Sequence, residues 1–510
     1  MPTERQPLLE EVRDPPEDAE PPSPYYFTVP VAFLAKLCFF ISTTTAVEIL
    51  LEIVCRLYWN SQHGPYSPPP GDRCAHPSVR RYFVMLKSLV VIMESLGGIF
   101  MYGPMSRLSG KYGRRSVLII LTIILILGTL CMIGAYRLPA VFTAPLLLAW
   151  LVLISITGAS QFDLMTVMYV VDTTTATSYQ RTSRLSFVMG WAHVSSIPGF
   201  AIGGALTTYL QNNTAVCWAV IGIALVLLAY ITFILPESFD RTSREKLQAE
   251  WLDERVEIGT GYITSALNTF FRPMLLLKPH RNPVTGGWNL RLLWCGIHAL
   301  FSGLASGYIW TAMVVYLALH LQELQPQFGP DDNSYVLKVG GLSTSLSLVV
   351  VTPLAIKFIS RFYGAANEDG VDSTNKGAGK MDKHLAIFGW TVDIIAVALL
   401  PLARTRVQVI ICVAALGASY FRLSAFRSVV AASGDPLRNG EILSAIQTIT
   451  SFGNALSGVV LGSVLTKSIS TFPSLVFLVY SAIASVSVLA LCLIKESDRY
   501  VPTTLLRYYG

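Results

Sequence analysis

The chain has 510 residues, of which 52% are hydrophobic and only 14% are charged, and its mean hydropathy is +0.52. Soluble domains carry about 25% charged residues, so a soluble chain of this composition could not cover its own surface, and a disordered chain would be far more polar. The formal net charge of +6 comes without a basic block, which argues against a nucleic-acid partner. Eight cysteines in a chain of this length do not form a disulfide scaffold. The composition predicts a membrane protein.

Twelve stretches are apolar and long enough to cross a bilayer, which takes about 20 residues per helix because lipid satisfies no backbone hydrogen bond. They are residues 31–55, 83–104, 116–135, 144–171, 184–209, 215–236, 291–320, 336–358, 384–403, 407–431, 441–466 and 471–494. The first stretch is too long for a cleaved signal segment and contains Lys36, Glu48 and Glu52. The sequence predicts an all-α membrane protein with twelve transmembrane helices.

The basic residues orient these helices, because Lys and Arg accumulate in cytosolic loops. With a cytosolic N-terminus, most of the 38 Lys and Arg residues fall in inner loops, so both termini are expected inside. We expect the following division: a disordered cytosolic N-terminus at 1–30, a six-helix bundle at 31–237, a cytosolic linker with an amphipathic segment at 238–290, a second six-helix bundle at 291–494 and a cytosolic tail at 495–510.

Two features of the predicted outer loops agree with this orientation. Asn212 begins an Asn-Asn-Thr glycosylation sequon close to the membrane. Cys55 and Cys74 flank the first outer loop, in a compartment where disulfides persist. A bridge between them and a pair of free thiols both remain open interpretations.

The two halves of the chain show related segments. Glu237 and Ser238 follow the sixth stretch, and Glu496 and Ser497 follow the twelfth. The 2–3 and 8–9 loops also both contain Tyr-Gly. In a 6+6 layout, these matches indicate parallel repeats about an axis along the membrane normal.

The loop between the second and third stretches runs Ser-Arg-Leu-Ser-Gly-Lys-Tyr-Gly-Arg-Arg over residues 106–115. It resembles the 2–3 loop of the major facilitator superfamily, whose pattern is Gly-x-Leu-Ala-Asp-Arg-x-Gly-Arg-Arg. The matching residues are Lys111, Gly113, Arg114 and Arg115. Ser106 replaces the first glycine, and Gly110 replaces an acid that helps a charge network hold the inner face shut. An ordinary positively charged inner loop is the alternative interpretation.

Two further segments carry the resemblance. The fourth stretch leads to Asp172, Arg181 and Arg184, similar to tetracycline-efflux-type and proton-coupled folate transporter-type members, although Leu151 stands where the family has an arginine. The fifth stretch resembles the family's Gly-Pro-x-x-Gly-Gly, with glycines that allow close helix packing, at Gly199, Gly203 and Gly204. The resemblance implies the major facilitator fold, with a central cavity lined by spans one, four, seven and ten.

Ionisable residues within the membrane are costly, so each is a functional hypothesis. Glu48 is a candidate substrate-binding or titrating carboxylate, and the alternative is a structural pair with Lys87. Lys36 could reach Glu94 on the second span.

Span four offers Gln161 and Asp163, of which Asp163 is either a proton carrier or a partnered acid. Span seven offers His298, which could titrate near neutral pH or serve as a buried structural donor.

Span ten carries two arginines. Arg422 is expected either to pair with Asp393 of span nine or to meet an anionic group of a substrate. Tyr420, Ser424 and Arg427 share another face by helical periodicity, and Arg427 could extend to the inner interface.

These features predict a secondary transporter that exposes a midplane site alternately to each side, driven by protons through Glu48, Asp163 or His298. Export of a small, partly apolar organic compound is favoured, and proton-coupled uptake of an organic anion is the alternative. A receptor on the same scaffold is disfavoured by the short tail.

Enzyme, nucleotide and metal motifs are missing from the sequence, so no catalytic residue, cofactor or metal is expected. We expect a monomer in the plasma membrane or, from the acidic dileucine pattern at residues 4–9, in the vacuolar membrane.

Overall fold

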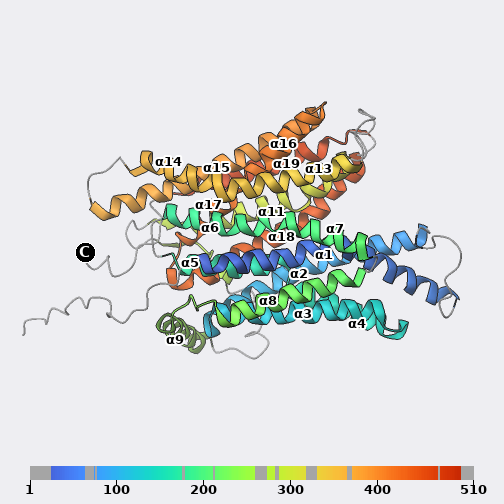
Figure 1. Cartoon of the computed structure of the whole chain (residues 1–510). Coiled ribbons are helices and arrows are strands. Elements are labelled where there is room, and N and C mark those ends of the chain that lie inside the picture. The colour runs from blue at the N-terminus through green and yellow to red at the C-terminus, as the bar shows by residue number, and fades with distance from the viewer. Residues whose placement is uncertain are drawn as a thin grey trace, which may run out of the picture.

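A computed structural model describes residues 25–63, 74, 77–174, 178–210, 213–258, 273–281, 287–317, 330–364, 370–468 and 471–495. Long, roughly parallel helices make up most of these residues (Figure 1). The helix α9 (Arg241–Ile258) lies at one end of the molecule, which we call the α9 end. The opposite end, near Cys55 and Cys74, is called the disulfide end.

The first half of the chain folds into the helices that the apolar stretches predict, after a single 3₁₀ turn at Tyr25–Phe27. Their bounds are α1 Thr28–His63, α2 Pro77–Tyr112, α3 Arg114–Arg137, α4 Ala140–Ile156, α5 Ala159–Asp172, α6 Ser178–Val194, α7 Ser196–Leu210 and α8 Asn213–Phe233. Spans four and five are each built from two consecutive helices, α4 with α5 and α6 with α7.

The second half begins after the linker, where α9 is followed by a short antiparallel pair, β1 (His280–Arg281) and β2 (Trp288–Asn289). The later helices are α11 Arg291–Tyr316, α13 Pro330–Leu346, α14 Thr352–Gly364, α15 Gly370–Leu399, α16 Arg406–Ala418, α17 Phe421–Ala431, α18 Asn439–Ser468 and α19 Leu475–Cys492. Short helical turns join them: a π-helical η4 at Ser347–Val351, η5 at Leu400–Leu402 and η6 at Pro436–Arg438.

Helices occupy all twelve predicted spans. By length and composition, eleven segments among the described residues are apolar enough to cross a membrane. The remaining stretch, 83–104, lies within the continuous helix α2, which carries Lys87 and Glu94. The chain is therefore an all-α membrane protein with twelve membrane-crossing segments.

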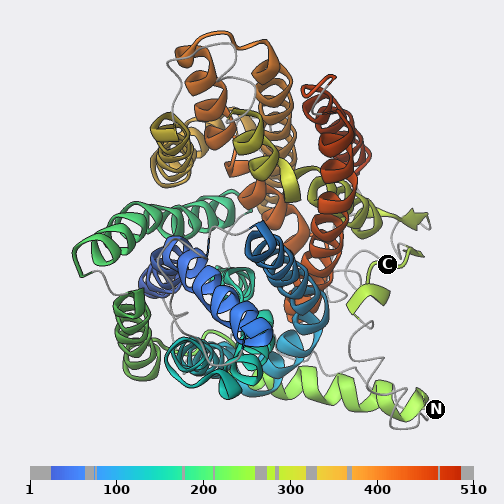
Figure 2. The same cartoon turned by 90° about the vertical axis from the view of Figure 1, so that its right-hand side faces the viewer.

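The helices form two bundles. In the first, α1 packs against α6, α7 and α8, and α3 packs against α4 and α8; in the second, α11 packs against α18 and α19, and α15 against α17 and α19. Figure 2, seen along the helices, separates the two groups, which meet where α2 lies against α18 and α6 against α17. Helices α13, α14 and α15 also contact α6, and α5 contacts α18, so the interface draws on several helices of each bundle.

Spans four and ten are interrupted at corresponding places. The first break falls at Thr157 and Gly158, between α4 and α5, and the second at Ser419 and Tyr420, between α16 and α17. A break within a membrane span is tolerated only where protein groups satisfy the freed backbone atoms. The buried amide of Gln161 does this in span four, where its Nε2 donates to the carbonyl of Ser155 at 3.2 Å. Gln161 is thus engaged inside the first bundle.

Candidate functional site

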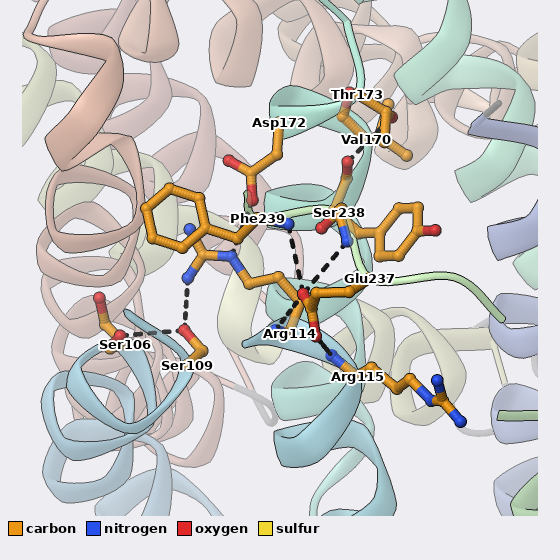
Figure 3. Close-up of polar contacts among 11 residues, drawn as sticks. Ser106, Ser109, Arg114, Arg115, Val170, Asp172, Thr173, Glu237, Ser238 and Phe239 are labelled. Carbon is orange, nitrogen blue, oxygen red and sulfur yellow. Dashed lines mark hydrogen bonds and ion pairs between the residues drawn. The ribbon is translucent and has the colours of Figure 1, made fainter. Parts of the chain in front are cut away.

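The arginine-bearing loop at the α9 end is organised around the carboxylate of Glu237 (Figure 3). That carboxylate accepts hydrogen bonds from four backbone N–H groups: Arg114 at 2.7 Å, Arg115 at 3.2 Å, Ser238 at 3.1 Å and Phe239 at 3.2 Å. A carboxylate at a helix N-terminus satisfies free N–H groups and the helix dipole. Gly113 has φ +95, and a Cβ there would lie 2.2 Å from Glu237 Oε2, so the turn requires glycine.

The side chain of Arg114 extends this network. Its Nε lies 2.8 Å from Asp172 Oδ2, its Nη1 donates to Ser109, and its guanidinium lies 4.8 Å from the ring centroid of Phe239. A side chain at Gly440 of α18 would approach Arg114 Nη2 to 2.9 Å. The loop is thus packed against the second bundle and uses Asp172 and Glu237 as its acids.

Helix α9 packs on Gly110, the position at which the 2–3 loop pattern of the major facilitator superfamily has an acid. A Cβ at Gly110 would lie 2.7 Å from the indole of Trp251. Trp251 Nε1 donates to Glu441 Oε1 of α18 at 3.1 Å, and Arg438 Nε lies 3.3 Å from Glu250 Oε2. The linker helix therefore connects α2 of the first bundle to α18 of the second.

The other basic residues predicted for this end have separate surroundings. Arg115 donates to the carbonyl of Thr232, and Arg184 lies 5.0 Å from the ring centroid of Tyr25. Lys111 is exposed and lies over the ring of Tyr112 at 5.1 Å, while Arg181 is half-buried near the start of α6. Arg115 and Arg184 thus each join segments that are distant in the sequence.

A buried carboxylate joins the two bundles near the α9 end. Asp382 of α15 accepts from the hydroxyl of Thr182 on α6 and from that of Ser428 on α17, each at 2.7 Å. All three side chains are fully buried. The sequence did not predict this contact, because ionisable residues were sought within the apolar stretches and Asp382 lies just before the stretch that begins at 384.

A polar cluster lies between the bundles at greater depth. Lys36 Nζ of α1 lies 2.8 Å from Asp163 Oδ2 of α5, and the two side chains are 15% and 27% exposed. The expectation that Lys36 would reach Glu94 is therefore wrong, because α5 brings a closer carboxylate to it. The ring of His193 on α6 lies 5.0 Å from that of Tyr420 on the opposite bundle.

Arg422 is held within the second bundle by a buried ion pair. Its Nη2 lies 2.8 Å from Asp393 Oδ1, and the two side chains are 5% and 0% exposed. Asp393 also accepts from Ser419 and Tyr480, and the guanidinium of Arg422 lies 4.3 Å from the ring centroid of Trp390. The pair with Asp393 is one of the two arrangements that the sequence left open for Arg422, and it compensates the charge of Arg422.

A cavity of about 280 Å³ adjoins this ion pair. Its aromatic and polar lining includes Trp310, Trp390, Tyr420, Arg422 and Asn454. Gly307 also lines the cavity and lets α11 approach α18 closely, because a Cβ there would lie 2.7 Å from Asn454 Cα.

Three buried polar atoms of the lining residues lack a hydrogen-bond partner: Arg422 Nε, Trp390 Nε1 and Asn454 Oδ1. An unsatisfied buried polar group costs about 1–3 kcal/mol, so a ligand that also carries a hydrogen-bonding group would be favoured here. Cavities with apolar walls and a few convergent polar groups are the usual form of small-molecule sites.

The remaining predicted candidates lie elsewhere. His298 is fully buried in the second bundle, where its Nδ1 lies 3.0 Å from the carbonyl of Ser487 and its ring packs on Phe426. Glu48 is exposed, and the Lys87 side chain with which it could pair lies outside what the structure describes. Glu52, near the disulfide end, accepts from the hydroxyl of Tyr136 at 2.8 Å.

The predicted outer-loop and packing residues are also placed. Cys55 forms a disulfide with Cys74. Asn212 lies outside the described residues, and the sequon's Thr214 is buried, with its hydroxyl 2.6 Å from Arg137 Nη2.

Of the three packing glycines, Gly199 and Gly203 are buried, whereas Gly204 is half-buried. A Cβ at Gly199 would lie 2.6 Å from Phe40 Cβ, whereas one at Gly204 would meet nothing within 4 Å. Close packing of α7 on α1 therefore depends on Gly199.

Two six-helix bundles around a central interface, with an arginine loop between the second and third spans, define a membrane transporter of the major facilitator type. The family model for the Major Facilitator Superfamily matches residues 84–366, and the chain belongs to this family. Its members are transporters and not enzymes.

Similar proteins agree with this assignment. The Major facilitator-type transporter psiT1 of Psilocybe cyanescens is 28% identical over 396 residues, which cover 72% of this chain and 82% of the relative. The human organic anion transporter MFSD10 (TETRAN) has a similar fold, with a TM-score of 0.61, 16% identity, and coverage of 92% of this chain and 99% of that chain. The fucose:proton symporter FucP of E. coli gives a TM-score of 0.58 at 12% identity, covering 92% and 98% of the two chains. The proton:xylose symporter XylE gives 0.59 at 12% identity, covering 92% and 96%.

Proposed function

We propose that the protein is a proton-coupled secondary transporter that exports a small, partly apolar organic compound. The carrying observation is the cavity of about 280 Å³ beside the Asp393–Arg422 pair, which has aromatic walls and reaches the interface between the bundles at Tyr420. The glycine pattern of span five is associated by resemblance with antiporters, which favours export. Alternating access would open the cavity first to one side of the membrane and then to the other.

The contacts between the bundles support a conformation closed at the α9 end. Thr182 and Ser428 both donate to Asp382 there, and Trp251 of the linker helix donates to Glu441. We propose that the α9 end is cytosolic, with both termini on that side. The conformation is then outward-facing, and transport requires these contacts to break.

Asp163 is the proposed proton carrier. Its carboxylate lies beside the interface and is 27% exposed, whereas His298 is fully buried and packed between helices of one bundle. An ionisable group must meet water on each side in turn to carry a proton, and Asp163 satisfies this requirement better. Protonation of Asp163 would release Lys36 and change the net charge at the interface.

Proton-coupled uptake of an organic anion is the second candidate. Two proteins of the same fold are the proton symporters FucP and XylE, and the interface contains the basic residue Arg427, half-buried on α17. We further propose a monomer in the plasma or vacuolar membrane.

The test is flux in proteoliposomes containing the purified full-length chain. A metabolite extract labelled with a stable isotope is loaded on one side, and mass spectrometry follows compounds that cross with and without an imposed pH gradient. Gradient-driven movement of specific compounds, abolished by a protonophore, is expected, and the direction relative to the gradient separates export from uptake. Saturable binding without any net flux would instead indicate a receptor and refute the proposal.

A further inference from the structure

Arg427 is a charged residue between the bundles that has no counterion in the part of the chain that the structure describes. Its Nη1 contacts the thioether sulfur of Met189 on α6 at 2.9 Å. A thioether is a weak acceptor, whereas a guanidinium presents five strong N–H donors. Most of the hydrogen-bonding capacity of Arg427 is therefore left for another group.

The neighbouring charges do not neutralise Arg427. Asp163 lies within electrostatic range of it, but the Asp163 carboxylate is 2.8 Å from Lys36, so that pair contributes no net charge. Arg422 is likewise compensated by Asp393 at 2.8 Å. Among these five side chains, one positive charge remains, and it is located at Arg427.

The position of Arg427 connects it to the cavity of the second bundle. Tyr420, Ser424 and Arg427 lie on the face of α17 that is turned toward α6, where Tyr420 packs on His193 and Ser424 contacts Met189. Tyr420 also lines the cavity of about 280 Å³. Tyr420 and Arg427 are seven positions apart, which corresponds to roughly 10 Å along the helix axis.

We propose that Arg427 binds the anionic group of the transported compound, whose aromatic or apolar body occupies the cavity beside Trp310, Trp390 and Tyr420. A planar guanidinium suits a carboxylate or phosphate because it can donate two parallel hydrogen bonds. Aromatic walls favour a ring. The substrate class is then organic anions whose charge lies within about 10 Å of an apolar ring. This inference rests on the proposed transport function.

The distance between the cavity and Arg427 determines the shape of such a compound. Tyr420 lines the cavity and also contacts His193, on the face of α17 that carries Arg427. Because Arg427 lies roughly 10 Å farther along the helix axis than Tyr420, a flexible spacer between ring and charge suits this reach better than a charge attached directly to the ring.

The experiment compares two compounds that differ only in charge. Binding of 4-phenylbutyrate and of its neutral amide, 4-phenylbutyramide, is measured by isothermal titration calorimetry on the full-length protein in lipid nanodiscs. The acid is expected to bind at least tenfold more tightly than the amide to the wild-type protein. Arg427→Gln should reduce acid affinity to that of the amide and leave amide affinity unchanged.

Two further variants keep the result interpretable. Arg241→Gln removes the same charge from the exposed face of α9, where Arg241 pairs with Glu245, and should preserve the preference for the acid. Met189→Glu supplies a counterion to Arg427 while keeping the arginine, and should also abolish the preference. It serves as the decisive variant if Arg427→Gln does not fold.

The outcomes separate this inference from the transport function. Three results would each overturn the role of Arg427. They are equal affinities for acid and amide in the wild type, no binding of the acid, and a preference for the acid that survives both Arg427→Gln and Met189→Glu. Flux of other compounds in proteoliposomes would leave the transport proposal intact in those cases. Conversely, acid-selective binding without flux of any compound would support the anion site and refute transport.

Discussion

Lys36 and Asp163 form an ion pair with 2.8 Å between Nζ and Oδ2, and it joins α1 to α5 beside the interface of the two bundles. Both side chains are partly exposed, at 15% and 27%. The pair therefore combines a fixed partner with access to solvent, which a proton carrier needs. His298 has a fixed partner, Ser487, within one bundle, but it is fully buried and has no access to solvent.

The first prediction concerns Asp163→Asn. This change removes the proposed proton carrier, so flux driven by a pH gradient should fall at least tenfold in proteoliposomes. Exchange of labelled for unlabelled substrate without a gradient should continue, because it requires no net proton movement. The separation of these two rates distinguishes loss of coupling from loss of folding.

Glu245→Gln is the matched control for Asp163→Asn. Glu245 lies exposed on α9 and pairs with Arg241, so its replacement removes one negative charge outside the transport path. Its gradient-driven flux should equal that of the wild type. Undiminished gradient-driven flux in Asp163→Asn would exclude Asp163 from coupling.

The second prediction concerns the pair between Asp393 and Arg422. Asp393→Asn leaves a buried guanidinium without its counterion, and breaking a buried pair on one side costs about 3–5 kcal/mol. Adding Arg422→Gln removes the uncompensated charge and should restore part of the lost stability. Thermal unfolding of the two single variants and the double variant in detergent gives the coupling between the residues. Additive losses would show that the pair does not act as a unit.

The third prediction concerns the glycines of span five. Gly199→Ala places a Cβ 2.6 Å from Phe40 Cβ and should destabilise the protein, since overpacking costs about 1–3 kcal/mol. Gly204→Ala meets nothing within 4 Å and should be neutral or slightly stabilising. Thermal unfolding of both variants provides the comparison. Equal effects at the two positions would contradict the helix approach seen between α1 and α7.

The fourth prediction concerns the turn before α3. Gly113→Ala forces a side chain into a backbone with φ +95 and against the Glu237 carboxylate, so stability should fall by about 1–3 kcal/mol. Glu237→Gln keeps one acceptor oxygen for the backbone N–H groups but loses the charge at the helix N-terminus, and should cost less. Thermal unfolding orders the two effects, and a larger loss in Glu237→Gln would refute this account of the turn.

Much of the fold follows from the sequence alone. Membrane spans are set by the hydrophobicity of consecutive residues, and this local property predicted the twelve stretches that the helices contain. Helical periodicity also predicted that Tyr420, Ser424 and Arg427 share one face, and these residues do contact α6 together.

The sequence predicted less well which intramembrane charges pair with each other. Depth along the helices correctly matched Arg422 with Asp393. The same reasoning matched Lys36 with Glu94, whereas Lys36 in fact meets Asp163. Depth is a property of each helix by itself, but contact also depends on the rotation of both helices and on which helices are neighbours.

The sequence by itself determined that this chain is a helical membrane protein, because hydropathy is a property of consecutive residues. Only the tertiary structure decided which charges are compensated. Arg422 and Arg427 are five residues apart, yet one faces Asp393 inside a bundle and the other faces Met189 across the interface. The packing of separate helices creates that difference, because it places distant carboxylates beside one arginine and a thioether beside the other.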